Sequence, residues 1–165
     1  MDDHAFMGEA LALAEEALAV GEFPVGCIMT VGGRVVTRGG RRGSAGGGLN
    51  ELDHAEMVAL RGLYTSGPLD PAAVSVFCTM EPCLMCFSAL VLHRIGRIVY
   101  AFEDPMGGGA SGDRTRLRPL YRDAPVVVEG GVRRGDALRL FKAFFGDSRN
   151  GYWRNSHLAR YTLEQ

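Results

Sequence analysis

The 165-residue sequence has almost no net charge and no long apolar runs, and both absences narrow the class of protein. A formal net charge of −1 provides no global electrostatic field that would attract nucleic acid. No apolar stretch approaches the roughly 20 residues of a membrane span, so we expect no membrane partner. Residues Met1 to His4 lack the basic segment that leads into the apolar run of a signal peptide. We therefore expect a single-domain cytoplasmic protein.

The sequence also has few cysteines, and the four present divide into two kinds by their neighbours. In a reducing compartment, paired cysteines indicate a metal site more often than a disulfide. Cys27 and Cys78 lie in apolar, strand-like runs, which is typical of buried small residues. Cys83 and Cys86 follow Pro82, a residue that suits the first turn of a helix. We expect their thiols to share one face of a helix N-terminus, where the helix dipole favours the thiolate.

A histidine and a glutamate upstream complete a metal-binding pattern. A zinc ion with three protein ligands keeps one coordination position open, whereas four protein ligands are typical of a structural ion. With His54, Cys83 and Cys86 as ligands, one Zn²⁺ per chain would lower the pKa of a water molecule to roughly 7. Glu56 projects to a different side of its helix, so we expect a proton shuttle rather than a fourth ligand. This arrangement suits hydrolytic removal of an exocyclic amino group from a heteroaromatic ring.

The hydrophobic pattern predicts alternating helices and strands in one α/β domain. The predicted helices are 3–20, 54–63, 83–92, 113–121 and 136–145, and the predicted strands are 23–30, 34–38, 74–79, 97–101 and 126–129. The first two strands form a hairpin, and the later alternation predicts right-handed crossovers and a largely parallel sheet behind it. The metal motifs then lie beyond the carboxyl ends of the strands, where ligands bind in open sheets.

Four segments resemble the zinc-dependent cytidine and deoxycytidylate deaminase superfamily, and within it the bacterial tRNA adenosine deaminase branch. They are Pro24-Val25-Gly26, His54-Ala55-Glu56, Met80 to Cys86 and Arg94 to Tyr100. The resemblance covers roughly residues 5 to 147 and implies a three-layer α/β/α fold with a five-stranded mixed sheet and a homodimer. It also implies zinc ligands at His54, Cys83 and Cys86 and a proton shuttle at Glu56. The base would be contacted by Pro24, Val25, Asn50, Ala55, Glu81, Pro82 and Asp104.

The chain departs from this branch at positions that contact the substrate. The branch usually carries an Asn after the second strand, and residues 38–42 contain none. Where the branch has Asp-Pro-Thr-Ala before the zinc ligand, this chain has Asn50-Glu51-Leu52-Asp53, with Asn50 as a candidate replacement. The substrate therefore stays open between adenosine in tRNA, converted to inosine, and a free base, nucleoside or nucleotide. A non-catalytic structural zinc module is a further alternative.

Two groups of arginines and a glycine-rich segment bear on this choice. The candidate basic patches are Arg38, Arg41 and Arg42, and Arg149, Arg154 and Arg160. Solvated surface arginines are the simpler interpretation of both groups. Residues 107–112 are glycine-rich but lack the Lys-Ser/Thr end of a P-loop, so we expect a flexible loop at the pocket rim.

The C-terminal residues are the least similar to the branch. We divide the chain into a zinc deaminase domain, 1–147, and a helical tail, 148–165, packed on it. Trp153, Leu158 and Tyr161 recur at roughly helical spacing, which fits a terminal helix that packs on the domain or covers the pocket. In the predicted helix 83–92, the apolar residues suit either a dimer contact or the core; they are Phe87, Leu90 and Val91.

Overall fold

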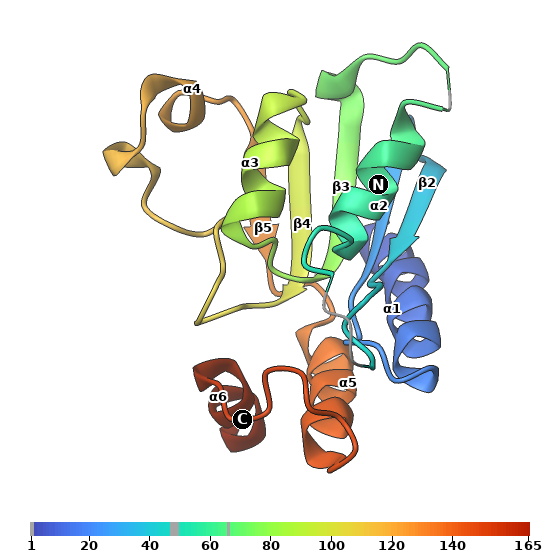
Figure 1. Ribbon diagram of the computed structural model, residues 1–165. Helices are drawn as coiled ribbons and strands as arrows, with labels where there is room; N and C mark the ends of the chain where they lie inside the picture. The colour runs from blue at the N-terminus through green and yellow to red at the C-terminus, as the bar shows by residue number, and fades with distance from the viewer. Residues whose placement is uncertain (1, 47–49, 66) are drawn as a thin grey trace.

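The computed structural model describes residues 2–46, 50–65 and 67–165, which form a five-stranded sheet flanked by helices (Figure 1). The strands are β1 (Gly26–Val31), β2 (Arg34–Gly40), β3 (Val74–Met80), β4 (Arg97–Phe102) and β5 (Val127–Gly130). Their order in the sheet is β2-β1-β3-β4-β5. Strand β1 is antiparallel to β2 and β3, whereas β4 is parallel to both β3 and β5. The predicted α/β class and mixed sheet are confirmed.

Helices cover both faces of this sheet and produce three layers (Figure 1). Helix α1 (Asp3–Ala19), with α5 (Arg134–Gly146) against it, covers one face, and α2 (Ala55–Leu63) and α3 (Leu84–Leu92) lie together over the other. Helix α6 (His157–Glu164) packs on α5. A 3₁₀ turn, η1 (Pro71–Ala73), precedes β3. Within the described ranges, we find no helix long and apolar enough to cross a membrane.

The prediction of one continuous helix over 113–121 is wrong. Asp113 caps a 3₁₀ turn, η2 (Arg114–Arg116), by accepting a 2.9 Å hydrogen bond from the backbone N–H of Thr115. Arg118 is extended, with ψ at 156°, because the ring of a following proline disfavours helical backbone in the residue before it. The chain becomes helical again only at α4 (Pro119–Arg122).

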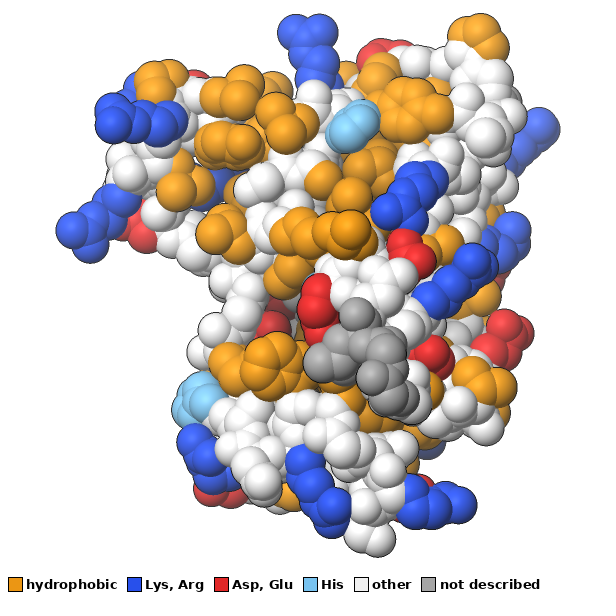
Figure 2. All heavy atoms as spheres, in the orientation of Figure 1, with side chains coloured by type: hydrophobic (Ala, Val, Ile, Leu, Met, Phe, Trp, Pro, Cys, Tyr) orange, Lys and Arg blue, Asp and Glu red, His pale blue; other side chains and the backbone are white. Residues whose placement is uncertain are grey.

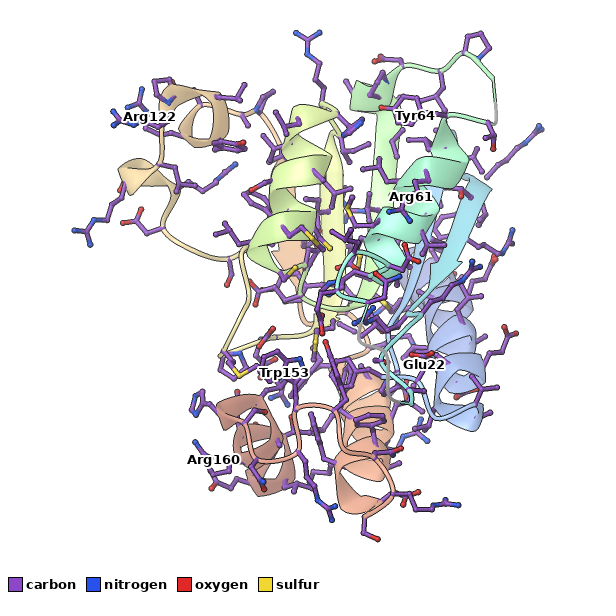
Figure 3. The ribbon with its side chains drawn as sticks, viewed as in Figure 1. Glu22, Arg61, Tyr64, Arg122, Trp153 and Arg160 are labelled. Carbon is purple, nitrogen blue, oxygen red and sulfur yellow. The ribbon has the colours of Figure 1, made fainter. Side chains whose placement is uncertain are left out.

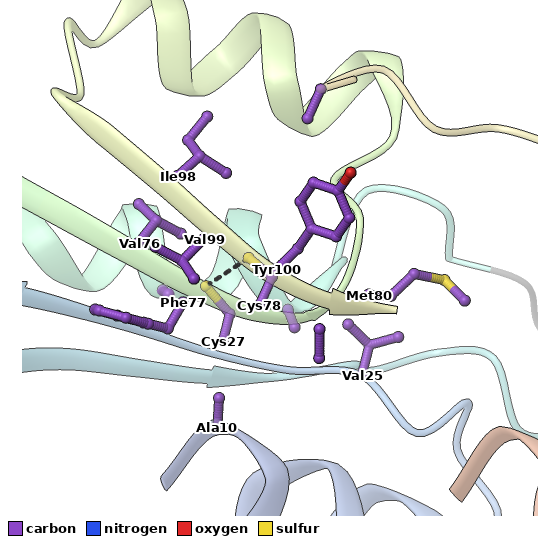
Figure 4. Packing of buried hydrophobic residues seen from close by; sticks show 14 of the residues in the cluster. Ala10, Val25, Cys27, Val76, Phe77, Cys78, Met80, Ile98, Val99 and Tyr100 are labelled. Atoms are coloured by element: carbon purple, nitrogen blue, oxygen red, sulfur yellow. Dashed lines mark hydrogen bonds between the residues drawn. The ribbon is translucent and has the colours of Figure 1, made fainter. Parts of the chain in front are cut away.

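The central strands are buried, and their side chains form the core (Figure 4). Cys27 and Cys78 pair across β1 and β3 with their sulfur atoms 3.5 Å apart, and both are fully buried thiols, as predicted. Phe87, Leu90 and Val91 also belong to the core. They are therefore not available as a dimer contact. The large apolar side chains that α3 exposes are Leu84 and Leu92.

Close packing between β2 and α2 places the start of α2 over the sheet. A Cβ atom on Gly39 would lie 2.2 Å from the carbonyl oxygen of Ala55, so only glycine allows this approach. The hydroxyl of Thr37 donates a 3.0 Å hydrogen bond to the carbonyl of Ala59. Helix α3 follows β3 after three residues and contacts α2. The N-termini of the two helices thus meet beyond the same edge of the sheet, as the sequence predicted.

Candidate metal centre and active site

Three metal-ligating side chains converge where α2 and α3 begin. His54 is the N-cap of α2 and Cys83 the N-cap of α3, and neither side chain makes a capping hydrogen bond. Cys86 lies one turn further along α3, so both sulfur atoms face the same side. The Nδ1 atom of His54 lies 3.5 Å from each sulfur, and the three candidate donor atoms lie within 4.8 Å of one another. The predicted ligands are therefore brought together.

The thiols and the imidazole perturb one another's protonation. A hydrogen bond from Cys86, together with one from His54, lowers the pKa of Cys83 to about 4. The same bond to Cys83, with burial, raises the pKa of the Cys86 thiol. Burial alone would lower the pKa of His54, but the contact with Cys83 and the charge of Glu56 outweigh burial and raise it. One thiolate therefore forms readily here, as a metal ligand requires.

This donor set fits zinc with one coordination position left open. One imidazole nitrogen and two sulfurs are ligands that zinc prefers, and a catalytic zinc keeps three protein ligands. Among the described residues, no further His, Cys, Asp or Glu joins the cluster. The carboxylate of Glu56 belongs to the second residue of α2 and is left for another role.

Glu56 is held in a buried position beside the cluster. Its side chain is only 3% exposed and contacts the thiol of Cys86. Burial raises the pKa of Glu56, and the charge of Cys83 adds to this shift. A raised pKa makes a carboxylate a stronger base, which suits a group that accepts and returns a proton. This is the property predicted for the proton shuttle.

A cavity of about 140 Å³ opens over the cluster and Glu56. Its walls come from the segment before β1, the start of α2, the end of β3, the loop after β4 and the C-terminal segment. The apolar lining residues include Phe23, Val25, Met80, Met106, Trp153 and Leu158, and the ionisable ones include Arg41, Glu51, Glu81, Asp104 and Tyr152. Mostly apolar walls with a few placed polar groups are typical of a small-molecule site.

Four of the seven residues predicted to contact the base line this cavity: Val25, Ala55, Glu81 and Asp104. The cavity lining does not include Pro24, Asn50 or Pro82. The amide of Asn50 donates to Asp53 at 2.8 Å, and its side-chain oxygen accepts from the backbone N–H of Leu52 at 2.9 Å. These bonds turn the chain towards His54. Contact with a base stays a prediction for all seven residues.

Glu81 and Asp104 shape the rim of the cavity. The Glu81 carboxylate accepts hydrogen bonds from the backbone N–H groups of Asp104, at 3.2 Å, and Ser111, at 2.8 Å. Asp104 in turn accepts from the N–H groups of Met106 and Gly107, and burial raises its pKa. Gly108 and Gly109 allow close packing here, because an added Cβ would lie 2.5 Å from the Glu81 carboxylate at Gly108 and 2.6 Å from the Cα of Leu84 at Gly109.

Three lining residues that no motif identified are Arg41, Glu51 and Tyr152. The prediction of a basic surface patch that includes Arg41 is wrong, because Arg41 is only 4% exposed and its side chain points inward. It donates to the Glu51 carboxylate at 3.1 Å and to the Tyr152 hydroxyl at 3.3 Å. Arg38 is paired with Glu9. Because Tyr152 lies 111 residues after Arg41, no local spacing signals that they meet.

The tail, 148–165, lines the cavity with residues from its helix and from the segment before that helix. Only 157–164 is helical, and the Ser156 hydroxyl caps α6 by accepting from the N–H of Ala159 at 3.1 Å. The expectation that Trp153 lies on the same helix is wrong, because this residue has a φ of 52° and lies before α6. Figure 3 shows Trp153 between the α5–α6 pair and the edge of the sheet. One wall of the cavity is therefore formed by Tyr152, Trp153 and Leu158.

The fold is a five-stranded mixed sheet between helices, and three donor atoms of the kind that zinc prefers converge at one edge of that sheet. A sequence model described as the cytidine and deoxycytidylate deaminase zinc-binding region matches residues 1–102. The chain belongs to this zinc-binding deaminase family, as its motifs predicted.

Individual relatives carry two different names, tRNA-specific adenosine deaminase and tRNA(Ile)-lysidine synthase. A tRNA-specific adenosine deaminase of Streptococcus pyogenes serotype M18 is 31% identical over 145 residues, which are 87% of this chain and 90% of the relative. A tRNA(Ile)-lysidine synthase of Deinococcus radiodurans is 40% identical over 151 residues, 88% of this chain, and the match spans only 25% of that protein. A structure from a study of tRNA:A34 deaminases matches with a TM-score of 0.70 and 31% identity, covering 82% of this chain and 98% of that one.

Proposed function

We propose that this protein is a zinc-dependent hydrolase that deaminates an adenosine of tRNA to inosine. The observation that carries the proposal is the buried Glu56 carboxyl group in the same small cavity as His54 and Cys83. The substrate is suggested by the relatives named tRNA-specific adenosine deaminase, which this chain matches over most of their length.

The reaction replaces a C–N bond of the base by a C–O bond and releases ammonia. Bound zinc supplies Lewis acidity, which lowers the pKa of water to roughly 7. Glu56 accepts a proton from the attacking water and later delivers it to the departing amino group, so the carboxyl group ends as it began. Because the side chain is buried, no bulk water competes for this proton.

The size of the cavity restricts what enters it. About 140 Å³ is small beside the roughly 300–1,000 Å³ of pockets for drug-sized ligands. We infer that the base alone enters and that the sugar and phosphates stay at the mouth. An adenosine of a tRNA loop would leave its stack to do so, stacking on aromatic side chains such as Trp153.

A free nucleobase or nucleoside is the second candidate substrate, favoured by the charge of the cavity. Glu51, Glu56, Glu81 and Asp104 all line it, against the single guanidinium of Arg41. This excess of carboxylates repels phosphate and favours the N–H donors of a base. In the second candidate basic patch, Arg149 is paired with Asp147.

An ammonia-release assay distinguishes these substrates. The zinc-loaded protein is incubated separately with free bases, nucleosides, nucleotides and an RNA stem-loop with adenosine at the wobble position. Glu56→Ala serves as the control that keeps the fold and the zinc ligands. Ammonia release with the stem-loop alone supports the proposal. Ammonia release with free bases or nucleosides alone supports the second candidate substrate and contradicts tRNA as the substrate. No release from any substrate would contradict deamination itself.

The proposal extends to the cell compartment and the assembly. All four cysteines are free thiols, which suits the cytoplasm. We also propose a homodimer. Exposed apolar side chains gather near α3 and α4, where Figure 2 shows a broad apolar area, and they include Leu84, Leu92 and Leu120. Sedimentation at micromolar concentration tests this assembly, and a monomer would contradict it.

A further inference from the structure

Glu51 lies where the end of β2, the start of α2 and the distant C-terminal segment meet. Its Oε2 atom lies 3.1 Å from Nη2 of Arg41, 3.3 Å from Nε2 of His54 and 3.0 Å from the hydroxyl oxygen of Tyr152. Arg41 follows β2, His54 caps α2, and Tyr152 lies 101 residues beyond Glu51. One carboxylate oxygen therefore joins the metal cluster, a buried guanidinium and the C-terminal segment.

The contact with His54 selects which imidazole nitrogen faces the cluster. Nδ1 lies 3.5 Å from the sulfurs of Cys83 and Cys86, whereas Nε2 faces Glu51. When a carboxylate accepts a hydrogen bond from Nε2–H, the lone pair of Nδ1 stays free and is directed at the metal position. The same hydrogen bond increases the basicity of Nδ1. Glu51 thus orients the ligand without being one.

Arg41 and Tyr152 keep the carboxylate in this place. Arg41 is 4% exposed, and it also donates to the carbonyl oxygen of Asn50 at 2.7 Å, which braces the turn that carries Glu51. The Tyr152 hydroxyl donates to Glu51, and the Tyr152 ring lies 5.3 Å from that of Phe23 and 5.5 Å from the guanidinium carbon of Arg41. The tail therefore reaches the metal histidine through a single hydroxyl and a single carboxylate.

We propose that Glu51 is a positioning residue that couples metal binding at His54 to docking of the C-terminal segment through Tyr152. Thermodynamic linkage makes such coupling reciprocal, so the metal stabilises the docked tail and the docked tail strengthens metal binding. A wall of the cavity is consequently ordered when the metal is present. The inference rests on the zinc centre and holds for either candidate substrate.

Zinc affinity and the fluorescence of Trp153 test this coupling without any activity measurement. Trp153 is the one tryptophan of the sequence, is 47% exposed, and lies edge-on to Tyr152 at 5.7 Å between ring centroids. In the wild-type protein, we expect zinc removal by a chelator to shift the Trp153 emission and to increase its quenching by acrylamide. Zinc affinity is measured by competition with a chromophoric chelator.

The variants separate orientation of His54 from general destabilisation. We expect Glu51→Ala to weaken zinc binding about 10-fold, the lower end of what such partners contribute. Glu51→Gln keeps an oxygen that accepts a hydrogen bond from Nε2–H, so we expect this variant to retain most of the wild-type zinc affinity. Tyr152→Phe retains the ring and loses only the hydroxyl, and we expect it to weaken zinc binding roughly 2- to 10-fold and to reduce the emission change.

Matched controls are Glu16→Gln, an exposed carboxylate on α1, and Tyr121→Phe on α4. Both are expected to leave zinc affinity and Trp153 emission at wild-type values. Circular dichroism establishes that each variant is folded, and Glu51→Gln with Tyr152→Phe carries the test if Glu51→Ala does not fold. The coupling would be overturned if Tyr152→Phe bound zinc with wild-type affinity. It would also be overturned if zinc removal left the Trp153 emission of the wild-type protein unchanged.

Discussion

Substitution of Gly108 by alanine tests whether the rim loop depends on close packing against Glu81. A Cβ atom there would lie 2.5 Å from the Glu81 carboxylate and 2.6 Å from the carbonyl oxygen of Asp104, both far inside van der Waals contact. Either Glu81 or the loop must move, although Glu81 receives the N–H groups of Asp104 and Ser111. Overpacking of this kind costs about 1–3 kcal/mol.

That cost converts to a fall in Tm of roughly 2–12 °C for a chain of this size. Because Glu81 and Asp104 line the cavity and are not candidate zinc ligands, we expect KM to rise while zinc content stays at one per chain. Differential scanning fluorimetry, zinc analysis and ammonia-release kinetics measure the three effects. Gly112→Ala is the matched control, since its added Cβ has only an ordinary 3.8 Å contact. A Gly108→Ala protein with wild-type Tm and KM would refute the reasoning.

Three other perturbations test the core, the tail and the thiols. Phe141→Ala removes a fully buried ring that contacts Phe23 and Phe102, and we expect it to lower the free energy of unfolding by about 3–5 kcal/mol in urea titration; a loss below 1 kcal/mol would contradict that packing. Hydrogen bonds from Arg134, with help from Tyr161, hold the pKa of Glu103 at about 2. Stability from this depressed pKa is complete above the unfolded value of about 4.3 and is lost as the pH falls towards 2, so Glu103→Gln is expected to flatten the acid limb of a urea-midpoint profile; an unchanged limb would argue against the pairing. Without metal, Cys83 is expected to react with a thiol reagent first, even near pH 5, and Cys27 only on unfolding, which a timed thiol count measures; early reaction of Cys27 would contradict its burial.

The sequence was sufficient for the parts of the fold whose determinants are local. The spacing of His54, Glu56, Cys83 and Cys86 predicts a metal cluster because helix starts and three-residue spacing fix the directions of side chains over short distances. The strand-helix alternation likewise predicts the parallel part of the sheet. The prediction of one helix over 113–121 is wrong for a reason that is also local, because Pro119 disfavours helical backbone at Arg118.

The cavity walls could not be predicted from local patterns, because they depend on contacts between distant residues. The local sequence predicts a surface position for Arg41, yet this side chain is buried and donates five hydrogen bonds to acceptors that include Glu51 and Tyr152. The pattern predicts that Asn50 contacts the base, which stays a prediction, and the structure adds that its amide group stabilises the turn before the histidine. Local sequence does not reveal this second use, because short polar side chains stabilise turns as well as bind ligands.

The most direct test of the central claim is a paired measurement of zinc content and ammonia release in Glu56→Gln, with the substrate that the wild-type protein deaminates. The variant keeps the shape of the side chain and removes only its ability to carry a proton. The account predicts one zinc per chain and a fall in kcat of about 10²- to 10⁴-fold. Wild-type turnover in the zinc-loaded variant would show that Glu56 is not the proton shuttle, and loss of zinc would show that it is a ligand instead.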